Sequence, residues 1–452
     1  MNDKRITMKV QDKNTRIHNF LEVEQGYTQE EAINEASRCL NCKNPRCVKG
    51  CPVNIMIPKF IEAIKNQNLK KAYEIISLSS SLPAICGRVC PQEKQCESMC
   101  IRGLKGEAIS IGALERFIAD YAIENNFNEI KCLKKNGKRV ALIGSGPSSL
   151  ACAGDLLKEG FEVTIYEILQ KAGGVLVYGI PEFRLPKRIV KSEIDKLVKA
   201  GAIIKCDVPV GNSISLDELR KEYDAVFIGT GAGLPKFMNI PGEEANEVFA
   251  ANEVLTRINL MGAYKVDSMT PIKKGNIAYV IGGGNVAMDA ARSLRRLGLI
   301  VHLMYRRSMD ELPARKLEVE HAQEEGIIFD VLKNPIEILK DENNKVTGMK
   351  VIDMELGEVD ASGRRSVKEK KDAVHTLQCD IVVEALGTSP NHEALKESNI
   401  ELSDKGLIIV EDGKTSLPNV YAGGDAVTGA ATVILAMSAG RNAAKKIIEC
   451  LK

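Results

Sequence analysis

Eight of the 13 cysteines in this 452-residue chain lie close together near the N-terminus, and the other five are scattered. The eight are Cys39, Cys42, Cys47, Cys51, Cys86, Cys90, Cys96 and Cys100. The chain starts with a polar segment that lacks the apolar stretch of a secretory signal, so we expect a cytoplasmic protein with reduced thiols. A dense block of reduced cysteines predicts metal or cluster ligation rather than disulfides.

The spacing of these cysteines favours iron–sulfur clusters. The first group reads Cys-x2-Cys-x4-Cys-x3-Cys-Pro and the second reads Cys-x3-Cys-Pro-x4-Cys-x3-Cys. Two groups of four, each with a Cys-Pro, are what two [4Fe–4S] clusters require. Zinc sites usually repeat short paired spacings, often with histidine, and the nearest histidine here is His18. Because the last cysteine of a run can ligate the other cluster in two-cluster ferredoxins, each group need not form its own cluster.

A first dinucleotide-binding pattern follows the apolar run 139–143. Gly144-x-Gly146-x-x-Ser149 matches the fingerprint in which glycines allow a tight turn and a close approach of the pyrophosphate. Glu167 ends the next apolar run, where a carboxylate can hold ribose hydroxyls. The pattern predicts an adenine dinucleotide with a free ribose. A ligand-free glycine turn is the alternative, and the acid after the second run argues against it.

A second pattern, Gly282-x-Gly284-x-x-Ala287, follows the apolar run 277–281. The position equivalent to the acid is taken by Arg306 and Arg307. Paired guanidiniums bind a 2′-phosphate with forked hydrogen bonds, whereas a carboxylate would repel it. The second site is therefore predicted to bind NADP(H). The alternative is that the two arginines are only solvated at the end of a strand.

Two nucleotide sites without a conventional substrate domain suggest a flavin reductase, in which a nicotinamide delivers hydride to a flavin. A later segment, 420–425, fits a flavin site because a short apolar run ends in a glycine pair and Asp425. Flavin next to iron–sulfur clusters also makes chemical sense, since flavin exchanges both electron pairs and single electrons.

The elements that must position these residues fall into two kinds. Thr28 and Glu31 form a capping-box pattern, and 58–76 and 111–123 carry helical periodicity. Beyond residue 138, apolar runs alternate with helical segments, which predicts parallel βαβ sheets. The runs are 139–143, 163–166, 225–228, 277–281, 301–305 and 381–384. The polar stretch 340–378 is expected to form exposed hairpins with no assigned function.

The predicted fold is therefore α/β, with an N-terminal α-helical iron–sulfur domain followed by two Rossmann-like nucleotide-binding domains. We place the cluster domain at 1–138, a discontinuous FAD domain at 139–250 and 385–452, and the NADPH domain at 251–384. Lys and Arg number 62 against 60 Asp and Glu, so bulk charge does not favour nucleic acid or an anionic membrane. No apolar run approaches the length of a transmembrane helix.

At this point the sequence resembles a known family, the small (β) subunit of NADPH-dependent glutamate synthase. It is also similar to the large subunit of NADH-dependent ferredoxin:NADP oxidoreductase and to the N-terminal half of dihydropyrimidine dehydrogenase. The resemblance covers nearly the whole chain. The matching segments are Arg38-Cys39-Leu40-Asn41-Cys42, Gly173-Gly174-x-Leu176, Gly179-Ile180-Pro181-x-x-Arg184-Leu185-Pro186, Gly282-Gly283-Gly284-Asn285-Val286-Ala287-Met288-Asp289 and Gly423-Gly424-Asp425.

The resemblance implies FAD in the first nucleotide domain, NADPH in the second, and the two-domain plan of glutathione and thioredoxin reductases. It also implies crossed cluster ligation. One cluster would use Cys39, Cys42, Cys47 and Cys100, and the other Cys51, Cys90, Cys96 and Glu115. Cys86 would then be a bystander, whereas counting cysteines alone would make Cys86 the eighth ligand. An oxygen ligand donates less electron density to iron than a thiolate and so tunes the potential.

No side chain needs to act as an acid or base in hydride transfer, so no catalytic residue is predicted. The residues expected to hold the two nucleotides are Gly144, Gly146, Pro147, Ser149, Glu167, Gly174, Arg184, Gly282, Gly284, Asn285, Ala287, Arg306, Arg307, Gly424 and Asp425.

The predicted function is an NADPH-linked oxidoreductase that exchanges electrons with a protein partner. That partner would be a glutamate synthase large subunit or a second flavoprotein subunit, and a homo-oligomer is the other possibility. The chain is too short to add an amidotransferase domain and a 2-oxoglutarate-reducing barrel, so we expect it not to make glutamate alone. Two alternatives stay open: the large subunit of an electron-bifurcating ferredoxin:NADP oxidoreductase, and a non-enzymatic assembly subunit with a structural metal domain. A disulfide reductase would need a Cys-x-x-Cys beyond Cys100, which the sequence lacks.

Overall fold

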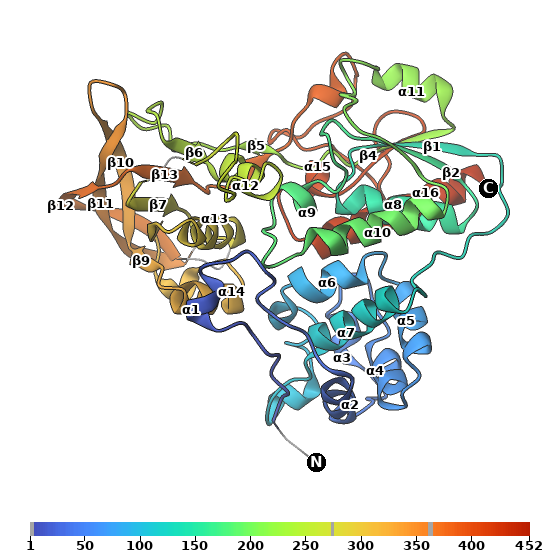
Figure 1. Ribbon diagram of the computed structural model, residues 1–452. Coiled ribbons are helices and arrows are strands. Elements are labelled where there is room, and N and C mark those ends of the chain that lie inside the picture. The colour runs from blue at the N-terminus through green and yellow to red at the C-terminus, as the bar shows by residue number, and fades with distance from the viewer. Residues whose placement is uncertain (1–3, 273–274, 360–364) are drawn as a thin grey trace.

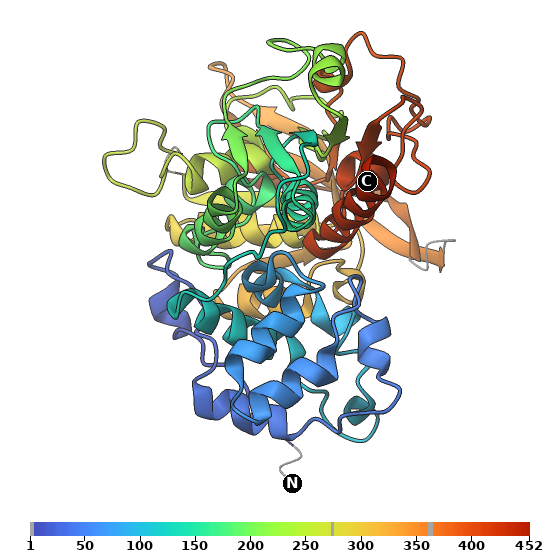
Figure 2. The ribbon, with the colours of Figure 1, turned by 90° about the vertical axis from the view of Figure 1, so that its right-hand side faces the viewer.

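The computed structural model describes residues 4–272, 275–359 and 365–452. The chain forms a helical N-terminal part and two α/β parts that lie side by side above it (Figure 1). The perpendicular view shows the same helical part beneath both of them (Figure 2). Across these described residues, we find no helix with the length and apolar character needed to cross a membrane.

The helical part carries the cysteines. Its elements are α1 (Lys13–Arg16), α2 (Gln29–Ser37), α3 (Arg46–Lys49), α4 (Ile57–Lys65), α5 (Leu69–Ser77), α6 (Pro83–Val89), the 3-10 turns η1 (Gln92–Lys94) and η2 (Ile101–Leu104), and α7 (Ile111–Glu124). The capping box of Thr28 and Glu31 at α2 is confirmed. The single periodic segment 58–76 is wrong as one helix, because Gln67 adopts a left-handed φ of 58° and Asn68 caps a new helix, α5.

The first α/β part is built on a parallel sheet in the order β15-β4-β1-β2-β3. Its strands are β1 (Arg139–Ile143), β2 (Glu162–Tyr166), β3 (Ile203–Lys205), β4 (Ala225–Ile228) and β15 (Val420–Ala422). Its helices are α8 (Pro147–Lys158), α9 (Val175–Tyr178), α10 (Lys187–Lys199), α11 (Leu216–Glu222), α15 (Asp425–Thr428) and α16 (Val433–Leu451), with the 3-10 turn η4 (Glu393–Leu395). The apolar faces of α8 and α16 pack on the sheet to form the core of this part.

The second α/β part has a parallel sheet in the order β6-β13-β7-β8-β9 and an antiparallel sheet β10-β11-β12 beside it. The strands are β6 (Val248–Ala250), β7 (Ile277–Ile281), β8 (Ile300–Tyr305), β9 (Ile328–Val331), β10 (Lys333–Lys340), β11 (Val346–Val359), β12 (Arg365–Gln378) and β13 (Ile381–Glu384). Its helices are α12 (Ala251–Asn259), α13 (Asn285–Arg296) and α14 (Lys316–Glu324), with the 3-10 turn η3 (Met309–Glu311). The exposed hairpin expected in 340–378 is β11-β12, and its residues 360–364 lie outside the described residues.

The chain passes between the two α/β parts twice, and the two passages pair as a short ribbon of β5 (Leu234–Pro235) and β14 (Thr388–Ser389). The β6 strand pairs with β13, so the second sheet begins a few residues before position 251. We propose that the FAD domain and the NADPH domain are these two α/β parts, with the crossover at the β5–β14 ribbon.

Candidate cluster and nucleotide sites

Four cysteines line one cavity at the edge of the helical part. Cys39, Cys42, Cys47 and Cys100 line this cavity, which is partly open to solvent. All four thiols are partly exposed. Burial raises the pKa of Cys47 to about 11, so binding a cluster here must displace protons from the thiols. We call this group the outer cysteines.

The remaining cysteines of the block lie deeper. Cys51, Cys90 and Cys96 are buried and lie close enough to Glu115 to interact with it electrostatically. Glu115 is only 6% exposed, and its Oε1 atom has no hydrogen-bond partner in the described part of the chain. Burial, and then the nearby charge of Glu193, raises the pKa of Glu115 to about 8. We call Cys51, Cys90, Cys96 and Glu115 the inner group.

The structure therefore groups Cys100 with the first run of cysteines and Cys51 with the second, as crossed ligation requires. Cys86 is fully buried and forms a hydrogen bond with Cys90, so five candidate ligands surround the inner position. Within the described residues, no three histidine, cysteine or acidic side chains converge as the ligands of a single metal ion would. The individual ligands of both groups remain proposals.

The first glycine turn leaves an open cradle at the N-terminus of α8. Gly144 has a φ of 89°, and a Cβ there would lie 2.6 Å from the carbonyl oxygen of Gly229. Gly146 has no neighbour within 4 Å of where a Cβ would stand. Gly174 closes over it, since a Cβ on Gly174 would lie 3.0 Å from the Gly146 Cα. The free amides and the positive end of α8 therefore face a space that suits a pyrophosphate.

The residues around this cradle differ in how well their contacts agree with a bound nucleotide. Pro147 begins α8, and Ser149 is fully buried against Gly229, which matches the packing role of the third fingerprint position. The two oxygens of Glu167 already accept hydrogen bonds from the backbone amides of Ser145 (2.9 Å) and Leu169 (2.8 Å). The carboxylate of Glu167 thus also braces the glycine turn, and its contact with a ribose stays a prediction.

Asp425 provides a second sign that a polar ligand belongs here. It begins α15 next to Gly424, which packs against Ser148 at the start of α8. The buried Oδ1 atom of Asp425 has no hydrogen-bond partner in the parts of the chain that the structure describes. Burial raises the pKa of this carboxyl to about 6. A ligand with hydroxyl groups would supply the missing donor.

The second glycine turn repeats the arrangement at the N-terminus of α13. A Cβ on Gly282, whose φ is 140°, would lie 2.5 Å from the carbonyl oxygen of Ala385, whereas Gly284 has open space around it. Asn285 is the first residue of α13 and Ala287 is fully buried. The three predicted pyrophosphate-site residues, and the predicted cofactor-binding residue Asn285, thus lie at one helix end.

The two arginines predicted to bind phosphate differ in their exposure to solvent. Arg306 is exposed at the end of β8. Arg307 is only 7% exposed and donates a hydrogen bond of 2.7 Å from Nε to the carbonyl oxygen of Arg365 on β12. Arg306 is therefore the better candidate for a 2′-phosphate.

Arg184 lies in an ion-pair network instead of at either glycine turn. Its Nη1 atom lies 2.8 and 2.7 Å from the two carboxylate oxygens of Asp289, and its Nε atom lies 2.8 Å from Glu318. Both acids belong to the second α/β part. The guanidinium is therefore already occupied, and a contact between Arg184 and a cofactor remains only a prediction.

Sequence reasoning missed a bridge between the cluster loop and the second nucleotide site. The backbone amide of Arg315 donates to the Asn285 side chain at 2.9 Å. Its guanidinium donates to the carbonyl oxygen of Arg88 at 2.9 Å and to the side chain of Gln92 at 3.2 Å. Gln92 lies between Cys90 and Cys96. No spacing in the sequence marks Arg315, because its partners are about 30 and more than 200 residues away.

The two open glycines give a direct test of the nucleotide sites. We expect Gly146→Ala and Gly284→Ala to fold normally, because their backbones are extended and nothing obstructs a Cβ. Gly146→Ala should lose FAD and keep binding NADP⁺, and Gly284→Ala should do the reverse. Flavin absorbance and calorimetric titration with NADP⁺ measure both. Gly144→Ala is the contrasting variant, since its positive φ and close contact should destabilise the fold itself.

Two family models match the chain. Residues 16–127 match dihydropyrimidine dehydrogenase domain II, 4Fe-4S cluster. Residues 138–440, more than half of the chain, match pyridine nucleotide-disulphide oxidoreductase. The first match covers the outer cysteines and the inner group, and the second covers both glycine turns.

Curated relatives match along almost the whole chain. The glutamate synthase [NADPH] small chain of Escherichia coli (strain K12) is 35% identical over 444 residues, which cover 96% of this chain and 94% of that one. The NADP(+)-dependent formate dehydrogenase subunit beta of Moorella thermoacetica is 37% identical over 433 residues, 90% of this chain. The present chain covers 60% of that longer relative.

Among solved structures, FprA of Mycobacterium tuberculosis in complex with NADPH is similar, with a TM-score of 0.60 and 23% identity. The match covers 70% of this chain and 84% of that one. At this level of identity the likeness shows a shared fold for the α/β parts.

Proposed function

Because the chain belongs to the glutamate synthase small-chain family of NADPH-dependent flavin and iron–sulfur oxidoreductases, we propose that it passes electrons from NADPH through two [4Fe–4S] clusters to a partner protein. The finer parts of this proposal are the number of clusters, the path between them and the partner. The observation that carries it is the arrangement of the two cysteine groups, one against the FAD part and one at the surface.

The inner group lies where the helical part meets the FAD part. Cys90 of the inner group, with its neighbour Cys86, belongs to the same hydrophobic core as β1, β2, β4 and the helices α8 and α16. Cys51 and Cys96 belong to the core of the helical part. Ser438 on α16 also donates a hydrogen bond of 3.1 Å to the carbonyl oxygen of Pro52, next to Cys51. The outer cysteines line a cavity that opens to solvent. Electrons that leave the FAD part would therefore reach the inner group first and the outer cysteines last.

The residues around the glycine turns have binding and orienting roles in this proposal. The amides at the N-terminus of α8 would hold the FAD pyrophosphate, and Asp425 would accept a hydrogen bond from a ligand hydroxyl. The N-terminus of α13 would hold the NADPH pyrophosphate, and Arg306 would pair with the 2′-phosphate. When bound, a flavin would supply the chemistry that links the two-electron hydride of NADPH to single-electron carriers.

The experiment that tests this function is an anaerobic titration of the purified protein with NADPH. We expect NADPH to bleach the flavin absorbance and then the broad cluster absorbance, with NADH much less effective. Protein that carries flavin and iron but is not reduced by NADPH would contradict the proposal. Co-purification then distinguishes the partners: a large subunit that uses glutamine and 2-oxoglutarate supports glutamate synthesis, and a second flavoprotein with a [2Fe–2S] cluster supports bifurcation.

We propose that the partner protein uses an acidic surface of its own to dock over the outer cysteines of this chain. Leu40 and Ile101 are exposed at the rim of the cavity, and Arg46 and Arg102 line it. Lys65 is exposed and lies near enough to Cys39 to lower its pKa against the larger effect of burial. A rim of cations around an apolar centre suits an electron-transfer partner with acidic residues around its own cofactor.

Charge reversal tests this docking face. The double variant Arg46→Glu and Lys65→Glu is expected to slow electron transfer to the partner protein about tenfold at low salt, because electrostatic steering is lost. Reduction of a small neutral dye should not change. Lys70→Glu is the matched control, since Lys70 is exposed on α5 of the same part and does not line the cavity. Equal slowing in the control, or no slowing in the double variant, would place the docking face elsewhere.

A further inference from the structure

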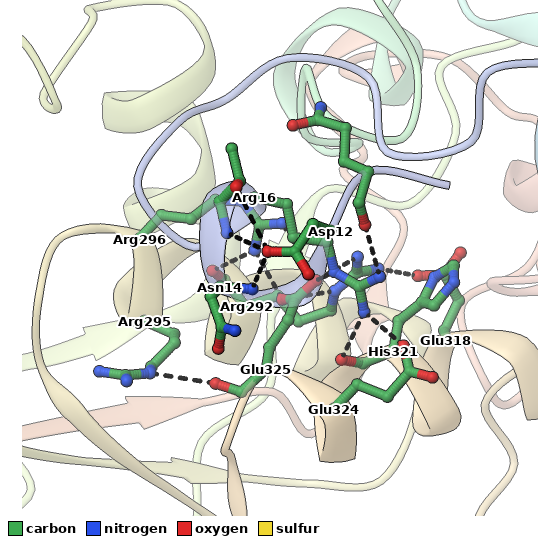
Figure 3. Close-up of polar contacts among 12 residues, drawn as sticks. Asp12, Asn14, Arg16, Arg292, Arg295, Arg296, Glu318, His321, Glu324 and Glu325 are labelled. Atoms are coloured by element: carbon green, nitrogen blue, oxygen red, sulfur yellow. Dashed lines mark hydrogen bonds and ion pairs between the residues drawn. The ribbon is translucent and has the colours of Figure 1, made fainter. Parts of the chain in front are cut away.

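The segment before the first cysteine runs from the helical part to the NADPH part and inserts one arginine there. Arg16, at the end of α1, is 1% exposed although it lies in a polar N-terminal segment. Its Nε atom donates to Glu325 at 2.8 Å, and its Nη2 atom donates to Glu324 at 2.8 Å and to the carbonyl oxygen of His321 at 3.3 Å. Figure 3 shows Arg16 among these residues at the C-terminal end of α14.

Glu325 is the centre of this network, since it also binds two arginines of α13. Arg292 donates to its carboxylate at 3.0 and 2.8 Å, and Arg296 donates to it at 2.6 Å (Figure 3). The two arginines and Glu325 are all buried. Both arginines belong to α13, the helix whose N-terminus forms the proposed NADPH cradle at Gly284. Arg16 is thus connected through one carboxylate to the helix that positions the nucleotide.

The same junction holds the FAD part. Phe183 lies beneath both arginines, with its ring centre 4.8 Å from the guanidinium carbon of Arg292 and 3.9 Å from that of Arg296. The backbone amide of Val23 donates to the carbonyl oxygen of Phe183 at 2.9 Å. Phe20 lies 6.2 Å from the Phe183 ring, centre to centre. Residues 11–24, which we call the strap, therefore contact both nucleotide-binding parts.

Rotation of the NADPH part about the β5–β14 ribbon would break this junction. It would separate Arg16 from Glu324 and Glu325, and Arg184 from Asp289 and Glu318, so both arginines would lose their acidic partners. Glu325 would keep Arg292 and Arg296. Removing one partner from a buried ion pair is strongly unfavourable. Hydride transfer within this arrangement would avoid that cost in every turnover.

We propose that Arg16 is a positioning residue, through which the strap clamps the NADPH part in the orientation that reduces the flavin. Glu325, which binds both Arg16 and the arginines of α13, would transmit the effect of the clamp to α13. Arg16 itself would touch neither nucleotide. This inference rests on the proposed NADPH-to-FAD direction of electron flow. It assigns a role in the reaction to a segment outside the cluster ligands and both nucleotide folds.

Arg16→Met tests the clamp, because methionine is long and apolar and cannot pair with Glu325. We expect the rate of flavin reduction by NADPH, measured by anaerobic stopped-flow, to fall about tenfold, since small misplacements of reacting groups have effects of this size or larger. The Kd for NADP⁺ and the flavin and iron contents should remain those of the unaltered protein. Arg16→Lys should restore part of the rate. Lys13→Met is the matched control, because Lys13 is exposed on the same short helix.

A second readout does not depend on turnover. Hydrogen exchange of the backbone amides in 11–24 and at the end of α14 should accelerate in Arg16→Met and remain slow in Lys13→Met. If Arg16→Met fails to retain its cofactors, Phe20→Ala replaces it, since this change loosens the strap at its aromatic contact. Faster exchange with an unchanged rate of flavin reduction would overturn the clamp. Lack of flavin reduction by NADPH in the unaltered protein would instead overturn the proposed function.

Discussion

A Cys96→Ser variant is expected to retain about four of about eight iron atoms per chain, whereas Cys86→Ser retains them all. Cys96 is buried and faces Glu115 in the inner group. Cys86 is fully buried beside Cys90, but crossed ligation with Glu115 leaves it without a cluster to bind. The pair of variants therefore separates two neighbouring thiols that the cysteine count alone cannot distinguish.

Iron and acid-labile sulfide analyses, together with electron paramagnetic resonance of the reduced protein, measure which cluster is lost. Glu115→Ala should behave like Cys96→Ser, because it removes the proposed oxygen ligand from the same position. Cys42→Ser should instead remove the outer cluster and leave the inner signal intact. Loss of a cluster from Cys86→Ser, with Glu115→Ala unaffected, would replace Glu115 by Cys86 as the eighth ligand.

Arg306→Glu is expected to lower the preference for NADPH over NADH by about 100-fold. A charge-assisted hydrogen bond to phosphate contributes about 1.5–3 kcal/mol, and a carboxylate at the same place would also repel the 2′-phosphate. Arg306 is exposed at the end of β8, in the position after the second glycine turn where the phosphate would lie. Binding of NADH, which lacks the phosphate, should change little.

The measurement is the ratio of kcat/KM values for the two coenzymes, supported by Kd values for NADP⁺ and NAD⁺. Lys199→Glu makes the same change of charge at an exposed position on α10 and should leave the ratio unchanged. Arg307→Gln should have a smaller effect than Arg306→Glu, because Arg307 already donates to the Arg365 carbonyl oxygen. A ratio that stays constant in Arg306→Glu would mean that another group binds the phosphate.

The strands show how far local pattern reasoning reaches. The apolar runs 139–143, 225–228, 277–281 and 381–384 are strands with the same bounds in the structure. The glycine turns follow two of them as expected, because a strand, a tight turn and a helix N-terminus are all encoded within about ten residues. The capping box at Thr28 is local in the same way. The break at Gln67 was missed, because a single left-handed residue does not disturb helical periodicity on either side.

The sequence by itself determined which chemistry to expect of this protein: the cysteine spacing predicts two clusters, and two glycine turns, one followed by an acid and one by arginines, predict two nucleotides. Tertiary structure decided which side chains remain available for that chemistry. Glu167 braces its own turn, Arg184 pairs with Asp289, and Arg16 is buried against Glu325 more than 300 residues away. The physical reason is that a ligand motif depends on neighbours in the chain, whereas a buried charge depends on the partner that packing brings to it.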